Sequence, residues 1–269
     1  MKQDLFDIVI IGAGVIGHSI AFRLKQCRPD LNLAVLGDPM NSLMASRAAA
    51  GMLAPFGECS EADGFFRFCR ESLLQYPNFI NDLISTSDIP VHLSMKGSLM
   101  PSSSLANDWE KQIRFLREEN IPHEIWSPAR CQQLAPALAA SCGEVLWVGE
   151  GQVNNREMHD ALVAASRKLG VEIFEKNVTG FVRDSSIVEA AITSTMEVRS
   201  QKFILASGSW SSQLGDALDL SLPLKPIKGQ MCRVQVQDAQ LDYTVHGLMT
   251  YVAPWRGGKG FVLGTTMED

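Results

Sequence analysis

The chain lacks the cysteine and histidine spacing of a metal or disulfide protein. Six cysteines are present among 269 residues, and no two of them form a CxxC pair. Cysteines scattered in this way are typical of reduced, buried thiols and not of a disulfide framework or a zinc site. None of the five histidines has a metal-ligand spacing. The sequence therefore predicts no bound metal.

Basic stripes and long apolar runs are also missing. Lysine and arginine number 24 against 30 acidic residues, for a net charge of −6, so we expect no nucleic-acid partner. No stretch reaches the ~18 apolar residues of a membrane span. The first residues, MKQDLFD, carry two acids before an apolar run that glycines interrupt, which is unlike a signal peptide. We expect a cytoplasmic protein without membrane association.

The chain has the composition of an ordinary globular protein. It is 46% hydrophobic and 20% charged, and it contains no repeats or low-complexity tracts. This length can form one large or two medium domains. No Ser-His-Asp or paired-carboxylate signature stands out.

The clearest motif is DIVIIGAGVIGHSIAF at 7–22. Gly12, Gly14 and Gly17 have GxGxxG spacing between a buried strand and a helix, and LNLAVLG (31–37) supplies a second buried strand. This order predicts a dinucleotide-binding loop, in which glycines permit the turn, the approach of a pyrophosphate and helix packing. The helix begins at Val15 and Ile16, whose N–H groups face the negative charge. The alternative is a glycine-rich turn in another α/β protein.

An acidic residue that should hold a ribose hydroxyl is absent from its usual place. Counting about 20 positions from Gly17 leads to Gly37, and Asp38 follows one position later. Three explanations stay open. The fingerprint is accidental, the carboxylate role has moved to Asp38, or the ribose is held differently, by Ser46 and Arg47 or by water.

The remaining pattern predicts alternating helices and strands. Propensity predicts a helix from Ala45 to Leu53 and longer helices at 63–86 and 105–120. Between them, 91–102 has a strand pattern, and 128–138 is short and bounded by prolines. Residues 143–182 predict a strand, a loop, an amphipathic helix and a strand. Further strand patterns follow at 189–199, at 201–214 and in the tail after residue 223.

Several of these stretches together resemble the flavin-dependent amine oxidases of the D-amino acid oxidase superfamily, and within it the glycine oxidases of thiamin biosynthesis. The stretches that carry the resemblance are DIVIIGAGVIG, SRAAAGMLAPFGEC, GQVNNREMHDAL, VEIFEKNVTGF, FILASGSWS, PLKPIKGQ and YVAPWRGGKGFVLGTTMED. AAAGMLAP and the YVxP…GTTME pair are the most specific of them. The resemblance implies an α/β fold, with a Rossmann-type FAD-binding domain at 1–87 and 148–222 and an inserted α+β substrate domain at 88–147 and 223–269.

The resemblance also implies how FAD is held. Small residues at 49–52 wrap the pyrophosphate and flavin, the main chain of Val178 meets the adenine, and the Ala-Ser-Gly turn closes on the cofactor. Trp210 is expected to pack. The implied cofactor residues, with those of the glycine loop, are Gly12, Gly14, Val15, Ile16, Gly17, Asp38, Ser46, Arg47, Ala49, Ala50, Gly51, Met52, Val178, Ala206, Ser207 and Gly208.

The implied chemistry is a hydride transfer from the substrate amine to the flavin. The imine then hydrolyses to a 2-oxo acid, and molecular oxygen reoxidises the flavin to give hydrogen peroxide, without a dedicated base. Tyr251 matches a contact to the substrate carboxylate, and Met267 and Met52 match the walls of the site. Met249 stands where the glycine-oxidase pattern has histidine, and His246 lies nearby in sequence.

Members of this superfamily continue for roughly another hundred residues, with an arginine that pairs with the substrate carboxylate. We therefore expect a fragment, one half of a split protein or a truncated product, which is either unstable and poor in flavin or folded against a companion polypeptide that supplies the missing part. If neither holds, Arg256 and Lys228 are the substitute cations to test first. A homo-oligomer is expected of the complete enzyme. Three functions stay open: an amine oxidase acting on a small amine or amino acid, a non-catalytic FAD-binding fragment or subunit, and an NAD-dependent dehydrogenase.

Overall fold

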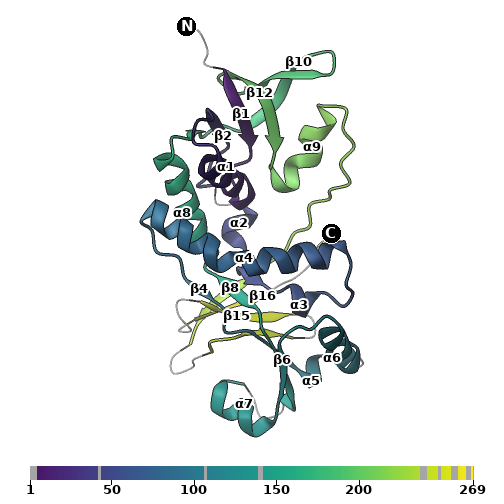
Figure 1. Cartoon of the computed structure of the whole chain (residues 1–269). Helices are drawn as coiled ribbons and strands as arrows, with labels where there is room; N and C mark the ends of the chain where they lie inside the picture. Colours follow the sequence, from purple (N-terminus) through teal and green to yellow (C-terminus); the bar gives the residue numbers. More distant parts are fainter. Residues whose placement is uncertain are drawn as a thin grey trace. The chain divides into compact units, whose positions relative to one another are not determined.

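A computed structural model describes residues 5–41, 44–105, 108–138, 142–236, 241–247, 250–255, 260–264 and 268. The chain divides into two compact units, shown in Figure 1. The first unit consists of Met1–Ala49, Asn81–Val91 and Asn155–Pro226, and the second of Ala50–Ile80, His92–Asn154 and Ile227–Asp269. Compactness thus groups residues 50–80 with the second unit, because Phe56, Phe66 and Leu73 pack into its core. The predicted domain division grouped them with the FAD-binding segments and stays a prediction.

The first unit is built on a six-stranded sheet. Its order is β10 (Val178–Asp184), β11 (Ile187–Thr193), β12 (Glu197–Leu205), β1 (Phe6–Ile11), β2 (Leu33–Leu36) and β9 (Glu172–Phe174). The four strands from β12 to β9 are parallel, whereas β10, β11 and β12 form an antiparallel meander. The strand–helix–strand order predicted for residues 7–37 is confirmed, and β2 is buried along its whole length, as parallel strands covered on both faces are.

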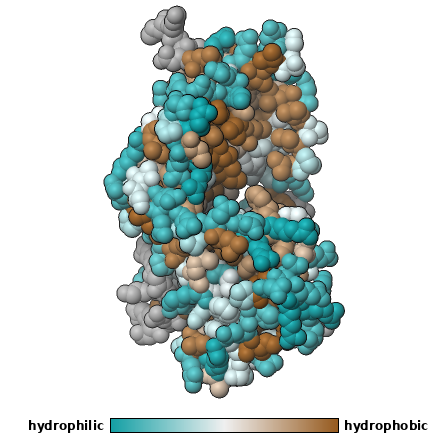
Figure 2. All heavy atoms as spheres, viewed as in Figure 1, coloured by the Kyte–Doolittle hydropathy of each residue, from teal (hydrophilic) through white to brown (hydrophobic). Residues whose placement is uncertain are grey.

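Two helices of this unit lie side by side in Figure 1, α1 (Val15–Cys27) and α8 (Asn155–Lys168). The short helices α2 (Ala45–Ala48) and α9 (Ser211–Asp216) and the 3-10 turn η3 (Gly208–Trp210) complete it. An apolar layer joins Val9, Ile11 and Leu36 to half-buried side chains such as Phe203 and Leu205. Hydrophobic atoms reach the surface over this unit in Figure 2.

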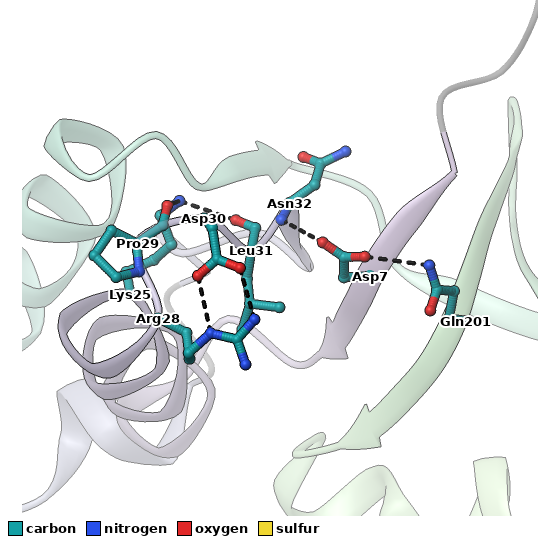
Figure 3. Close-up of polar contacts among 8 residues, drawn as sticks. All are labelled: Asp7, Lys25, Arg28, Pro29, Asp30, Leu31, Asn32 and Gln201. Carbon is teal, nitrogen blue, oxygen red and sulfur yellow. Dashed lines mark hydrogen bonds and ion pairs between the residues drawn. The ribbon is translucent and has the colours of Figure 1, made fainter.

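The edge of this sheet where the parallel strands begin is held by polar contacts, shown in Figure 3. The Asp7 carboxylate accepts hydrogen bonds from the Asn32 N–H at 2.8 Å and from Gln201 Nε2 at 3.2 Å. Lys25 Nζ donates to the carbonyl oxygens of two residues of the α1–β2 turn, at 2.8 and 2.9 Å. The Arg28 guanidinium makes two hydrogen bonds to Asp30. These side chains join strands β1 and β12 to the α1–β2 turn, away from the loops that follow the strands.

The second unit contains two sheets. A seven-stranded sheet has the order β13 (Cys232–Gln235), β16 (Gly260–Gly264), β15 (Tyr251–Trp255), β14 (Thr244–His246), β5 (Ser98–Pro101), β7 (Val145–Val148) and β6 (His123–Trp126). A smaller sheet has the order β3 (Met52–Leu53), β8 (Gly151–Val153) and β4 (Leu93–Ser94). The helices are α3 (Pro55–Glu58), α5 (Ser102–Leu105), α6 (Trp109–Glu118) and α7 (Pro128–Leu134). Helix α4 (Gly64–Ser87) begins in this unit, and its last residues belong to the first.

Three sequence expectations need correction. The helix predicted from Ala45 to Leu53 ends at Ala48, because Gly51 has a φ of +77° and Met52 already belongs to strand β3. The strand pattern at 91–102 divides into β4 and β5 around Gly97, whose φ is +105°. All six cysteines are free thiols, but only Cys131 is buried. The helix predicted at 63–86 is confirmed.

Candidate functional site

The loop after β1 is the first part of the candidate site. Gly12 has a φ of +119°, and a Cβ there would stand 2.2 Å from the carbonyl oxygen of Ala206. A Cβ on Gly17 would stand 1.9 Å from the carbonyl oxygen of Gly12. The absence of side chains at these glycines therefore allows the loop to contact the end of β12 and the first turn of α1, as the spacing predicts.

The start of α1 offers open hydrogen-bond donors. Gly14 has a φ of −78°, and a Cβ there would lie 3.1 Å from Ser46 Oγ. The same hydroxyl oxygen accepts a hydrogen bond from the Val15 N–H at 3.0 Å. Among the described residues, the N–H groups of Gly14 and Ile16 have no hydrogen-bond partner. Such donors at a helix N-terminus fit a phosphate oxygen.

The structure explains why no acid stands at the end of β2. Gly37 has a φ of +142°, and a Cβ there would lie 2.9 Å from the backbone nitrogen of Ala13. A carboxylate at this position would therefore displace the glycine loop. Asp38 Oδ1 instead accepts the Met40 N–H of its own turn at 2.8 Å. Its contact with a ribose stays a prediction.

Helix α8 fixes the segment that carries Ser46 and Arg47. Asn155 Nδ2 donates to the carbonyl oxygen of Ser46 at 2.7 Å. The Arg47 guanidinium forms an ion pair with Asp160 and lies 3.3 Å from Nδ1 of His159. Sequence reasoning named Ser46 and Arg47 but missed these three partners. Their spacing of four and five residues, one face of the helix predicted in GQVNNREMHDAL, was the available signal.

His159 also contacts the glycine loop. Its Nε2 lies 2.9 Å from the carbonyl oxygen of Ala13, and the side chain is fully buried. Burial lowers the pKa of His159, the Arg47 charge lowers it further, and the contacts with Ala13 and Asp160 oppose this. The imidazole is therefore neutral near pH 7, as a histidine beside a guanidinium has to be.

The Ala-Ser-Gly turn after β12 lies beside the same loop. Ala206 donates its N–H to the Ile11 carbonyl oxygen at 2.7 Å, and Ser207 Oγ lies 3.0 Å from Ser211 Oγ. Gly208 has a φ of +58° and begins η3. Trp210 is half-exposed.

The first unit thus brings together a group of the predicted cofactor residues: Gly12, Gly14, Val15, Gly17, Ser46, Arg47 and Ala206. Val178 is elsewhere in the sheet, as the first residue of β10. It is half-buried in the apolar layer and paired with Thr193. Its contact with an adenine stays a prediction, as do the roles of Ala49, Ser207 and Gly208.

In the second unit, the small residues after α2 are held by Gln152. Its Nε2 donates to the carbonyl oxygens of Ala50 and Pro254, at 3.1 and 2.7 Å. Gly51 accepts the Val153 N–H at 2.9 Å, and Met52 pairs with Gln152 in the β3–β8 ladder. One amide side chain therefore joins this segment to strand β15.

Tyr251 lies in the same apolar cluster as Met52, together with Ala50, Ala253 and Val262. Two predicted site residues that are far apart in sequence thus pack against the same cluster. The Tyr251 hydroxyl donates to Met231 Sδ at 2.8 Å. Burial raises the pKa of Tyr251, and the charge of Glu58 adds to this effect. The phenol is protonated near pH 7, and its single hydrogen could be donated to a carboxylate only if the hydroxyl turned away from Met231 Sδ.

A buried acidic group lies near Tyr251. Glu150 is fully buried, and its Oε1 accepts the N–H groups of Phe56 and Gly57 at 2.5 and 2.7 Å. Its Oε2 lies 3.7 Å from Nε2 of His246, which stands opposite Tyr251 in the β14–β15 ladder. Burial raises the pKa of Glu58, Glu150 adds to this and His246 opposes it. No sequence pattern indicated Glu150, because an acid in a loop before a strand is ordinary.

Four residues discussed from the sequence lie outside the described residues: Met249, Arg256, Met267 and Asp269. Lys228, considered there as a substitute cation, is exposed and forms an ion pair with Glu268 at 2.7 Å. Its role as a substitute cation stays a prediction. Across the described residues, no group of His, Cys, Asp or Glu is placed to hold a metal, and no helix of that part of the chain is long and apolar enough to cross a bilayer.

Comparisons with known proteins agree with this arrangement. A family model described as FAD dependent oxidoreductase matches residues 7–269. The bifunctional protein ThiO/ThiG of Trichormus variabilis is 31% identical over 98% of this chain and 40% of its own length. The glycine oxidase of Geobacillus kaustophilus is 27% identical over 97% of this chain and 70% of its own length. The chain thus spans well under half of the first relative and about two thirds of the second.

Solved structures share the fold. The crystal structure of glycine oxidase from Geobacillus kaustophilus matches with a TM-score of 0.89 and 26% identity, over 98% of this chain and 72% of that one. That of iminodiacetate oxidase from Chelativorans matches with a TM-score of 0.82 at 20% identity, over 97% of this chain and 72% of that one. These superpositions confirm the predicted fold class.

Proposed function

Because the chain belongs to the family of FAD-dependent oxidoreductases, we propose that the protein oxidises the amine of glycine or another small amino acid. FAD is the cofactor of the family, as the resemblance predicted. A nicotinamide-dependent dehydrogenase is not favoured by this membership. The proposal of a small amine rests on relatives named glycine oxidase and ThiO/ThiG.

The residues of the first unit fit the pyrophosphate of FAD. A Cβ would collide with backbone at Gly12, and the Gly14 N–H has no partner among the described residues. Gly14 and Ile16 would hold the phosphates through their backbone N–H groups, with Ser46 and Arg47 beside them, whereas the N–H groups of Gly12 and Val15 already donate to the Leu36 carbonyl oxygen and to Ser46 Oγ. Bound FAD supplies an acceptor for two electrons.

The packing of Met52 and Tyr251 against one apolar cluster is the observation that carries the proposal. Tyr251 is a protonated phenol, which could donate to a substrate carboxylate if its hydroxyl turned away from Met231 Sδ. In the proposed site, Met52 and the backbone of Ala50 and Gly51 would limit the space next to Tyr251, which would suit an amino acid with little or no side chain.

The overall reaction balances as follows. The amine gives up two electrons and two protons to become an imine, and water hydrolyses the imine to a 2-oxo acid and ammonia. Molecular oxygen takes up two electrons and two protons as hydrogen peroxide. In this scheme the chain's own residues bind and orient the substrate and exclude water, and no described side chain needs to act as a base.

Substrate oxidation by the purified protein tests the proposal. Peroxide release and oxygen uptake are measured with glycine, sarcosine and D-alanine, and flavin reduction is followed separately without oxygen. We expect flavin bleaching and peroxide with at least one of the three amines. Bleaching without peroxide would indicate a dehydrogenase that uses another electron acceptor. A flavin that none of these amines bleaches would favour a non-catalytic FAD-binding protein.

A further inference from the structure

The contact between His159 and the glycine loop defines the protonation of the imidazole. The Ala13 carbonyl oxygen can only accept, so Nε2 of His159, at 2.9 Å, must carry the hydrogen. Nδ1 of the neutral ring is then an acceptor, and the Arg47 guanidinium lies 3.3 Å from it with its own hydrogens. Both ring nitrogens therefore have partners of the right kind, in one tautomer only.

This bond determines which way a peptide of the loop faces. In a trans peptide unit, the carbonyl and the following N–H point in opposite directions. His159 holds the Ala13 carbonyl oxygen on the side of α8, so the Gly14 N–H points to the opposite side. Among the described residues that N–H has no partner. Glycines next to this peptide leave its rotation poorly restrained by the chain itself.

We propose that His159 is a positioning residue for FAD, which fixes the Ala13–Gly14 peptide so that the Gly14 N–H is available to a phosphate oxygen. This inference rests on FAD binding at the glycine loop. It does not depend on the substrate, and it assigns a role to a side chain of helix α8 that acts through the Ala13 carbonyl oxygen. Arg47 supports it from the other ring nitrogen, with its charge balanced by Asp160.

The groups around His159 keep its imidazole neutral, with the hydrogen on Nε2. The charged and titratable groups that face it are His18 of α1, Arg47 of α2 and Asp160 of α8 itself. A proton added to Nδ1 would face the Arg47 guanidinium and replace an acceptor by a donor. Acid should therefore weaken FAD binding through this residue, because the protonated ring repels the side chain that supports it.

His18 provides a matched control. Its ring lies 5.8 Å from that of His159, at an interplanar angle of 80°, and it is also fully buried. Ser166 Oγ donates to the Leu162 carbonyl oxygen at 2.8 Å, so it accepts from Nδ1 of His18 at 3.1 Å. The His18 side chain thus has its own hydrogen bond inside the same layer of helices, and only the backbone N–H of this residue donates to the glycine loop, at the Gly14 carbonyl oxygen.

FAD titration of the apoprotein tests the proposal, with flavin fluorescence as the measurement and urea denaturation as the check on folding. His159→Leu should weaken FAD binding about tenfold. His159→Gln, whose amide can donate to the Ala13 carbonyl oxygen, should recover most of the affinity. His18→Leu should lower the stability by a similar amount and change FAD affinity by less than about twofold.

Equal losses of FAD affinity in the two leucine variants would overturn the proposal, because His159 would then contribute only to packing. Should His159→Leu fail to fold, nitrogen-15 NMR of the parent decides: a neutral ring protonated on Nε2 is expected, and any other form rejects the proposal. If the parent binds FAD and the His159 variants bind it equally tightly, this inference is rejected and the proposed function is unaffected. A parent that binds no FAD rejects both.

Discussion

Nε2 of His246 lies 3.7 Å from Oε2 of Glu150, and both atoms are buried without a hydrogen-bond partner among the described residues. The other oxygen of Glu150 holds two N–H groups at the start of α3. His246 is directly opposite Tyr251 in the β14–β15 ladder. Glu150 therefore holds the start of α3 through one oxygen and places the other beside the strand pair that carries Tyr251.

Replacement of Glu150 should destabilise the protein. Glu150→Ala leaves the N–H groups of Phe56 and Gly57 buried without an acceptor, at a cost of about 2–5 kcal/mol in the free energy of unfolding. Glu150→Gln keeps one carbonyl oxygen for these donors and should cost clearly less. Urea denaturation of the two variants and the parent measures the difference. Equal losses in both variants would contradict the assigned role of Oε1.

Tyr251 should contribute to substrate binding. Tyr251→Phe removes the hydroxyl and should raise KM for carboxylate-bearing amines more than it lowers kcat, since a hydrogen bond to a charged group contributes ~1.5–3 kcal/mol. Tyr243→Phe is the matched control, because Tyr243 packs against Trp126 in a different cluster. Steady-state kinetics with the amine that is oxidised fastest measures KM and kcat of the two variants and the parent. An unchanged KM in Tyr251→Phe would remove this residue from the site.

Glycines with positive φ should differ in their tolerance of alanine. Gly12→Ala combines a φ of +119° with a Cβ that would stand 2.2 Å from the Ala206 carbonyl oxygen, so it should lose both stability and FAD binding. Gly170 has a φ of +77° with nothing within 4 Å of a Cβ. Gly170→Ala should therefore cost only ~1–2 kcal/mol.

Substitutions at Gly14 distinguish an effect on FAD binding from an effect on folding. Its φ is ordinary and its Cβ would be near a hydroxyl alone, so Gly14→Ala should fold. Gly14→Val should in addition place a side chain where the pyrophosphate is proposed to lie. Thermal denaturation and FAD titration distinguish the two effects. A Gly14→Val variant that keeps its flavin as tightly as the parent would place FAD elsewhere.

Acid should lower the stability of the first unit, because His18 is buried there. Burial, with the charges of His159 and Arg167, lowers the pKa of His18 from 6.5 to about 3. The unfolded chain therefore binds a proton that the folded chain does not, so this stabilisation is present above pH 6.5 and is lost as the pH falls towards 3. The slope for one such group approaches ~1.4 kcal/mol per pH unit.

His18→Asn, whose amide can still donate to Ser166, should flatten this dependence. The free energy of unfolding from urea titrations between about pH 7 and pH 5 measures it. The same slope in parent and variant would show that His18 does not set the acid sensitivity.

Much of the fold was predictable from local pattern. The glycine loop between two buried strands, the helix at 63–86 and the amphipathic helix after GQV all follow from hydrophobic periodicity and glycine spacing, which are properties of neighbouring residues. The helix expected from Ala45 to Leu53 was wrong beyond Ala48. Alanine-rich sequence favours a helix, but the pairing of Met52 with Gln152 in a distant strand outweighs that propensity.

By itself, the sequence determined the dinucleotide-binding loop and the resemblance to FAD-dependent oxidoreductases, because both depend on motifs of contiguous residues. Only the tertiary structure decided the partners: His159 for the Ala13 carbonyl oxygen, Asp160 for Arg47 and Glu150 for the turn at Phe56. These pairs are separated by more than ninety residues. Periodicity indicates which face of a helix is buried, but which distant backbone group that face meets depends on how the whole chain packs.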